Sequence, residues 1–214
     1  MDLILIPTAH ISKKSIQKVK ITIKNEKPDI IAVELDKQRA LALLSGKKPS
    51  LKILLKNPSF LFMYFAQQIL GIIFKSTPGE EMRTALFEAG KNKIPILLAD
   101  MPISQIVQNM KKITLKEKLK MLLPMKIKGI SSIDELTNPD KLRPLLKKIE
   151  EKYPMLYKVL LEDRNQFIFN RISKVNYEKI VGVFGAGHIP GLIDLIKQYN
   201  LNNPEEKINL KIIM

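Results

Sequence analysis

The stretch Leu3-Ile4-Leu5-Ile6-Pro7-Thr8-Ala9-His10 decides the fold, because it joins a strand pattern directly to a helix pattern. Its four consecutive apolar residues, two of them β-branched, predict a short buried strand over residues 2–7. The proline is expected to end this strand, since it has no N–H to donate to the ladder. Helical spacing follows at once over residues 12–25. His10 is therefore expected at the carboxyl end of a strand, where open α/β sheets bind their ligands.

The same order of strand and helix recurs along the chain and predicts an α/β fold with a mainly parallel or mixed central sheet. The later strands are expected over residues 30–35, 94–100, 179–184 and 208–213. The helical stretches, roughly 51–90 and 102–175, are too long to be simple crossovers between strands. We therefore expect a large helical layer or cap over the strand ends, within a single domain that covers residues 1–214.

Composition limits the classes of function. The 214 residues include no cysteine, which excludes disulfides and thiolate metal sites. The net charge of +15 permits nucleic acid or an anionic membrane as partner. The lysines are scattered, however, and no basic run is interleaved with aromatic residues, so nucleic-acid binding is not favoured. No signal peptide is apparent, and we expect a cytoplasmic protein, with membrane association as the alternative.

One apolar segment, FLFMYFAQQILGIIF over residues 60–74, stands out from this polar surface. It is too short to span a membrane and is interrupted by two glutamines and a glycine. Its aromatic and aliphatic residues are too many for one solvent-facing helix. We therefore predict that the segment 51–74 forms a homodimer contact or a membrane-surface contact.

The second of the two histidines, His188, closes a run of the same kind as the first, over residues 180–188. Four of the nine glycines surround it, and they would allow tight turning and close approach of the backbone to a ligand. These are Gly182, Gly185, Gly187 and Gly191. A dinucleotide-binding loop does not fit, because Pro190 stands where the third glycine would be needed. No nucleotide cofactor is expected.

Carboxylates occur in the same setting as the histidines. Glu34 lies near the end of the second predicted strand, and a buried carboxylate needs a partner, for which Arg39 or a backbone N–H is the simple candidate. Asp36 is predicted to be a helix N-cap. Two imidazoles, His10 and His188, with one or two carboxylates at strand ends would form a mixed nitrogen and oxygen ligand set. Such a set suits a divalent catalytic metal with an open position.

Three other charged positions have simpler structural interpretations. Asp100 ends the third predicted strand, and Glu81 begins a helix, where acids are usually caps or partners of the helix dipole. The run Asp163-Arg164-Asn165 lies within a predicted helix and is interpreted as a solvated face.

Four runs together resemble the TraB/PrgY family: TAHISKKS (8–15), VELDKQR (33–39), GEEMR (79–83) and GAGHIPG (185–191). That family includes regulators that shut down peptide pheromone activity. It belongs to a wider group with the Tiki metalloproteases, GumN-like proteins and erythromycin esterases. The resemblance implies that the site contains His10, Glu34, Arg39, Glu81, Arg164 and His188.

Together these observations favour a metal-dependent, peptidase-like hydrolase that acts on a peptide and uses manganese, cobalt or zinc. The predicted metal ligands are His10, Glu34 and His188. The predicted catalytic residues are Glu34, Arg39, Glu81 and Arg164. Thr8, Ser12, Gly185 and Gly187 are predicted to contact the substrate. The alternative is a non-catalytic peptide-binding or regulatory domain in which the same residues form a fixed polar network.

Overall fold

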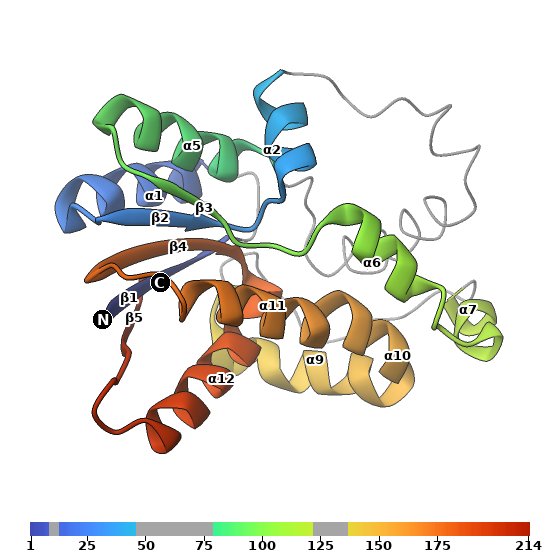
Figure 1. Cartoon of the computed structure of the whole chain (residues 1–214). Coiled ribbons are helices and arrows are strands. Elements are labelled where there is room, and N and C mark those ends of the chain that lie inside the picture. Colours follow the sequence, from blue (N-terminus) through green and yellow to red (C-terminus); the bar gives the residue numbers. More distant parts are fainter. Residues whose placement is uncertain (9–12, 46–78, 122–136) are drawn as a thin grey trace.

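The computed structural model describes residues 1–8, 13–45, 79–121 and 137–214, which form a sheet with helices on both faces (Figure 1). His10, Ser12 and the predicted contact segment 51–74 lie outside the described residues.

The sheet confirms the predicted α/β class. Its five strands are parallel and lie side by side in the order β3-β2-β4-β1-β5. They are β1 (Asp2–Thr8), β2 (Ile30–Val33), β3 (Ile96–Leu98), β4 (Lys179–Gly185) and β5 (Asn209–Ile212). β4 lies at the centre, between β1 and β2, so the strands that carry Glu34 and Gly185 are direct neighbours. β1 and β2 do not pair with each other.

The central strands are buried on both faces, as expected for continuous apolar runs in a parallel sheet. β1 continues to Thr8, one residue past the predicted end, and its proline is opposite Phe184 of β4. β5 pairs with β1 only as far as Leu5. Beyond that residue no strand of the described part of the chain pairs with this side of β1, so a residue without an N–H is tolerated there.

The helices and helical turns, in chain order, are α1 (Lys13–Glu26), α2 (Lys37–Leu44), α5 (Glu80–Asn92), α6 (Ile103–Met110), α7 (Leu115–Met121), α9 (Pro139–Lys152), α10 (Pro154–Tyr157), the π-helical turn η1 (Lys158–Glu162), α11 (Asp163–Ile172), the 3₁₀ turn η2 (Ala186–His188) and α12 (Ile189–Asn202). α1 and α5 cover one face of the sheet, and α11 and α12 cover the other (Figure 1). None of the helices in these ranges is both long and apolar enough to cross a membrane.

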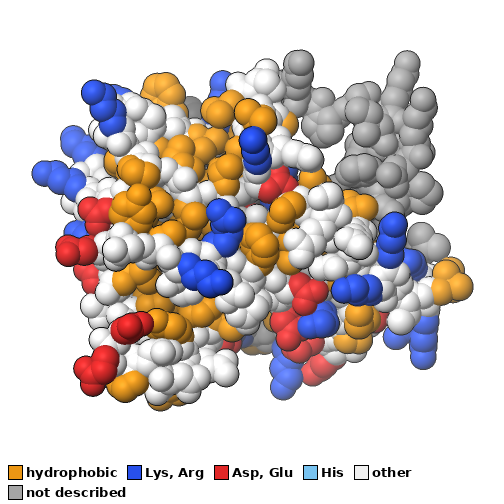
Figure 2. Space-filling view, viewed as in Figure 1, with side chains coloured by type: hydrophobic (Ala, Val, Ile, Leu, Met, Phe, Trp, Pro, Cys, Tyr) orange, Lys and Arg blue, Asp and Glu red, His pale blue; other side chains and the backbone are white. Residues whose placement is uncertain are grey.

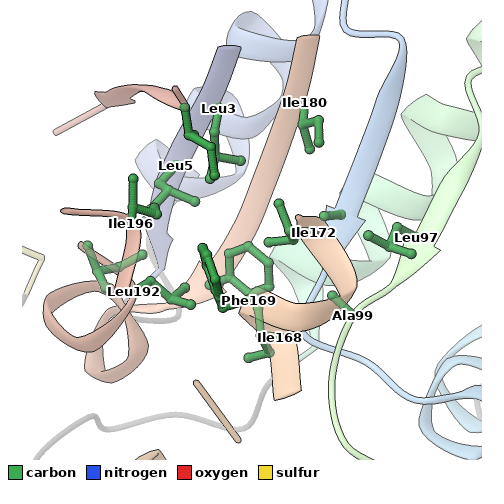
Figure 3. Packing of buried hydrophobic residues seen from close by; sticks show 14 of the residues in the cluster. Leu3, Leu5, Leu97, Ala99, Ile168, Phe169, Ile172, Ile180, Leu192 and Ile196 are labelled. Carbon is green, nitrogen blue, oxygen red and sulfur yellow. The ribbon is translucent and has the colours of Figure 1, made fainter. Parts of the chain in front are cut away.

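The core of the sheet shows how α11 is held in place. Ile168, Phe169 and Ile172 of α11 pack with residues of α12 over β1 and β4 (Figure 3). Asn165, Ile168, Phe169 and Ile172 are the buried residues of α11 and are three or four positions apart. This spacing places them on one side of the helix, directed toward the sheet.

A separate apolar cluster joins α6, α9, α10 and η1, and its members among the described residues include none from a strand. These helices extend beyond the carboxyl ends of the strands, where a helical layer or cap was predicted (Figure 1). On the face shown in Figure 2, lysine and arginine side chains are dispersed among acidic and apolar ones and form no single basic patch.

Candidate functional site

Acidic residues follow two neighbouring strands at the carboxyl edge of the sheet. Glu34 comes directly after β2, and Asp100 comes two residues after β3. Arg164, in the first turn of α11, joins them. Its Nη2 donates to Oε1 of Glu34 at 2.5 Å and to Oδ2 of Asp100 at 2.5 Å, and its Nε donates to Oδ1 of Asp100 at 3.0 Å. Two carboxylates and one guanidinium therefore form a largely buried ion-pair network.

The π-helical turn before α11 contributes to the placement of this arginine. Nη1 of Arg164 donates to the carbonyl of Leu160, within η1, at 3.1 Å. Single π-helical turns inside helices are frequent at functional sites. Four of the five N–H groups of Arg164 are thereby committed to protein acceptors.

Residues from three structural elements contact the carboxylate of Glu34. Besides Arg164, its Oε2 accepts from the backbone N–H of Gly185 at 2.6 Å, and its Oε1 lies 3.2 Å from Nε2 of His188. A Cβ at position 185 would come within 2.9 Å of Oε2, so glycine is what allows this approach. Of the two partners predicted as alternatives, Arg39 or a backbone N–H, the structure has the backbone N–H.

Arg39 pairs with Asp100 instead. Its Nη2 donates to Oδ2 of Asp100 at 2.5 Å and to the carbonyl of Met101 at 3.3 Å. Its Nε is buried and makes no hydrogen bond in the described part of the chain, although Oδ2 of Asp36 is 3.5 Å away.

Asp36 caps α2 as predicted, since its Oδ1 accepts from the backbone N–H of Arg39 at 2.7 Å. Its Oδ2 also accepts from the N–H of Ile103, the first residue of α6, at 2.5 Å. One carboxylate therefore joins the N-termini of two helices at the edge of the network.

His188 lies at the end of η2, after β4, and is 3% exposed. Its two ring nitrogens face two different partners. Nδ1 is 2.6 Å from Oδ1 of Asn165, and Nε2 is 3.2 Å from Oε1 of Glu34. A buried imidazole thus connects an amide on α11 with the carboxylate that follows β2.

The charges of the network stabilise one another. Burial alone would raise the pKa of Glu34, but His188 and Arg164 hold this pKa well below its ordinary value. Burial would likewise raise the pKa of Asp100, and Arg164 and then Arg39 lower it. Burial would lower the pKa of Arg164, and the two carboxylates raise it above its ordinary value. Both acids are therefore ionised at neutral pH, and Arg164 contributes to the low pKa of each.

The structure places the remaining predicted residues as follows. Thr8 is buried at the end of β1, where its hydroxyl donates to the carbonyl of Phe184 at 3.2 Å. Gly187 is buried in η2. Glu81 is buried in the first turn of α5, a helix that packs against β2 and β4.

Two members of the network, Asp100 and Asn165, were missed. Asp100 is the shared acceptor of both arginines, a larger role than the predicted cap. The interpretation of Asp163-Arg164-Asn165 as a solvated face is wrong for its last two residues, because Asn165 is 4% exposed and the side chain of Arg164 is 12% exposed. The sequence did contain a sign that Asn165 is buried, because Asn165 lies at helical spacing from Ile168 and Ile172 on the apolar side of α11.

The structure brings two of the predicted metal ligands together. Nε2 of His188 and Oε1 of Glu34 are 3.2 Å apart. Two ligands at about 2.0–2.1 Å from one ion, subtending about 90–110°, are separated by about 2.9–3.4 Å. Among the residues that the structure describes, no group of three or more histidines and carboxylates could hold a metal ion. The third predicted ligand, His10, is outside them.

These features define a class of protein: a parallel α/β domain with an acid–arginine–histidine network at the carboxyl edge of its sheet. The chain belongs to the TraB/PrgY/gumN family, whose sequence model matches residues 2–202. It is also 36% identical over 228 residues to the uncharacterized protein MJ1365 of Methanocaldococcus jannaschii, a match that covers 98% of this chain and 57% of the relative. The chain thus spans little more than half the length of that relative.

Proposed function

We propose that this network is the centre of a metal-dependent hydrolase that cleaves a peptide. The observation that carries the proposal is the setting of His188. One ring nitrogen lies 2.6 Å from an amide oxygen, and the other lies 3.2 Å from a carboxylate oxygen. Metal-binding histidines almost always have their second ring nitrogen fixed by an oxygen acceptor in this way. A peptide is the substrate class that the resemblance to the family implied.

In this proposal His188 and Glu34 hold manganese, cobalt or zinc together with His10. The bound metal would polarise the scissile carbonyl and lower the pKa of a bound water. The low pKa of Glu34 keeps its carboxylate ionised, which suits a ligand, and makes it a weak proton acceptor. The role of general base then falls to Glu81, the other predicted acid.

The two arginines have different roles in this proposal. Arg164 has one N–H group left after its bonds to Glu34, Asp100 and Leu160, so it holds the acids in place. Arg39 uses only Nη2 from its side chain in hydrogen bonds within the described residues, and its side chain is 28% exposed. Arg39 therefore has donors left to stabilise a developing oxyanion.

The second candidate is a non-catalytic peptide-binding or regulatory domain. One observation favours it: both carboxylate oxygens of Glu34 and of Asp100 already accept hydrogen bonds from the protein. A network that is satisfied in this way can be purely structural.

Metal binding separates the two candidates. Protein purified without chelator or nickel resin is titrated with manganese, cobalt and zinc by calorimetry and then incubated with a peptide library. We expect one ion per chain, lost in His188→Ala and Glu34→Gln and retained in the control Asp194→Asn, which removes an exposed acid paired with Arg143. Wild-type protein that stays metal-free in excess of all three ions and cleaves no peptide would favour the binding domain.

A further inference from the structure

Asn165 is the least expected member of the network and is buried together with His188. The two side chains are 4% and 3% exposed, and Oδ1 of Asn165 is 2.6 Å from Nδ1 of His188. Asn165 directly follows Arg164 in the first turn of α11. One helical turn therefore supplies both the cation that holds Glu34 and the amide that contacts the histidine.

The chemistry of this contact determines where the proton of a neutral imidazole lies. An amide oxygen only accepts hydrogen bonds, so Nδ1 of His188 must carry the proton. The lone pair of the ring is then on Nε2, which points toward Oε1 of Glu34 at 3.2 Å. Two acceptors that face each other at this distance repel unless a cation lies between them.

Without Asn165, the neutral ring of His188 would carry its proton on Nε2 instead of Nδ1. Among the described residues Glu34 would then be the only acceptor in contact with the ring, and Nε2 would carry the proton and donate to it. A protonated Nε2 cannot bind a metal, since the ligand must present a lone pair. The amide therefore decides whether His188 faces Glu34 as a donor or as a potential ligand.

Gly191 makes this arrangement possible. It lies in the first turn of α12, three residues after His188, and an added Cβ would be 2.2 Å from Nδ2 and 3.2 Å from Cγ of Asn165. Real Cβ atoms essentially never approach so closely, so any side chain at position 191 would displace the amide. Glycine at position 191 therefore leaves the room that the side-chain amide of Asn165 occupies.

We propose that Asn165 is a positioning residue that fixes His188 in the Nδ1–H tautomer, and that Gly191 provides the space that keeps Asn165 beneath the ring. The assignment of the proton to Nδ1 follows from the contact between Asn165 and His188. Its consequence, a lone pair on Nε2 for a metal, rests on the function proposed above.

The tautomer can be measured directly because the chain has only two histidines. In His10→Ala protein labelled with ¹⁵N-histidine, the only imidazole is that of His188, and long-range ¹H–¹⁵N correlation spectra distinguish its protonation states. In the metal-free protein near pH 8 we expect the Nδ1–H form. A neutral Nε2–H form, or a ring protonated on both nitrogens, would overturn the proposal.

Three variants and a control then test whether Asn165 determines the tautomer of His188. Asn165→Leu removes the acceptor and should convert His188 to the Nε2–H form, whereas Asn165→Asp keeps an acceptor and should keep the proton on Nδ1. Gly191→Ala should reproduce the effect of Asn165→Leu by displacing the amide, and it remains informative if the leucine variant does not fold. Gly90→Ala is the matched control, because nothing lies within 4 Å of a Cβ added there. An Nδ1–H form that persists in Gly191→Ala and in folded Asn165→Leu would contradict the proposal.

Cobalt titration tests whether the tautomer of His188 affects metal binding. The same variants are used, in protein that retains His10. Loss of an outer partner of a metal-binding histidine typically lowers metal affinity about 10–100-fold. We expect a loss of that size in Asn165→Leu and Gly191→Ala and none in Gly90→Ala. If the wild type shows the Nδ1–H form but binds no metal, the proposed function fails while the inference about Asn165 stands. If the metal-free wild type shows the Nε2–H form and the protein nevertheless binds metal when it is added, the inference about Asn165 fails and the proposed function does not.

Discussion

Replacing Arg164 with leucine would remove a cation that contacts both strand-end acids. In the folded protein Arg164 donates to Glu34 and, through Nε and Nη2, to Asp100. The exposed fractions of the three side chains are 12%, 16% and 0%. The substitution therefore leaves two carboxylates largely buried and only partly paired.

The loss of stability can be bounded from the contacts that remain. Removing one partner of a buried ion pair typically costs about 3–5 kcal/mol. Asp100 keeps Arg39 and the N–H of Met101, and Glu34 keeps the N–H of Gly185. We therefore expect the lower end of that range, about 3 kcal/mol at pH 7.

The loss should depend on pH in a defined direction. The pKa values of Glu34 and Asp100 are both lowered in the folded protein, so their ionisation contributes stability above their unfolded values, near about 4. That contribution disappears as the pH falls through the lowered folded values. The free energy of unfolding of the wild type should therefore decrease below about pH 4 more steeply than that of Arg164→Leu, and the two should converge.

Urea unfolding followed by circular dichroism at pH 7 and at several values below 4 measures these differences. The matched control is Arg143→Leu, since Arg143 makes a two-pronged ion pair with Asp194 at 2.7 Å but the two side chains are 38% and 56% exposed. An exposed pair contributes at most about 1 kcal/mol. Equal losses in the two variants at pH 7, or a loss in Arg164→Leu that grows at low pH, would refute the reasoning.

The remaining predictions concern single contacts and can be measured by chemical unfolding. Gly185→Ala should destabilise by about 1–3 kcal/mol, because its Cβ would push Glu34 off the backbone N–H. Gly90→Ala should stabilise by about 0.5–1 kcal/mol, because this exposed glycine lies inside α5 with open space around it. Lys93→Gly should also stabilise, by about 1 kcal/mol, because Lys93 has a positive φ of 56°. Glu117→Ala should cost about 1–2 kcal/mol, because its carboxylate accepts the two N–H groups that begin α10. An opposite sign at any of these positions would contradict the corresponding contact.

The edge of the sheet at which the site forms was predictable from the sequence because parallel strands align their carboxyl ends. Glu34 and His188 each follow a buried apolar run, and the structure brings them within 3.2 Å of each other. The α/β class followed from the same runs, since strands covered on both faces are continuously apolar. The end of α5 was less predictable: glycine commonly follows the last residue of a helix, but this helix continues past Gly90 to Asn92 and has Lys93 as its C-cap.

The choice of partners was not predictable, because it depends on the order of the strands. β2 lies between β3 and β4, so Glu34 meets Asp100 through Arg164 on one side and Gly185 on the other. Nothing in the local sequence around Glu34 distinguishes Arg39, five residues away, from Arg164, which is 130 residues away. Local spacing favours the nearer arginine, and the sheet order assigns it to Asp100.

The composition of the network is itself an argument for function. A buried cluster of ions is often no more stable than apolar residues of the same volume, and removing one partner is strongly destabilising. This chain nevertheless places two arginines, three carboxylates and a histidine at the edge where open α/β sheets bind ligands. Shifted pKa values concentrate at such sites because catalysis and ligand binding require them. A purely structural role would leave unexplained why an amide and a glycine, Asn165 and Gly191, are used to orient a ring that already has Glu34 as a partner.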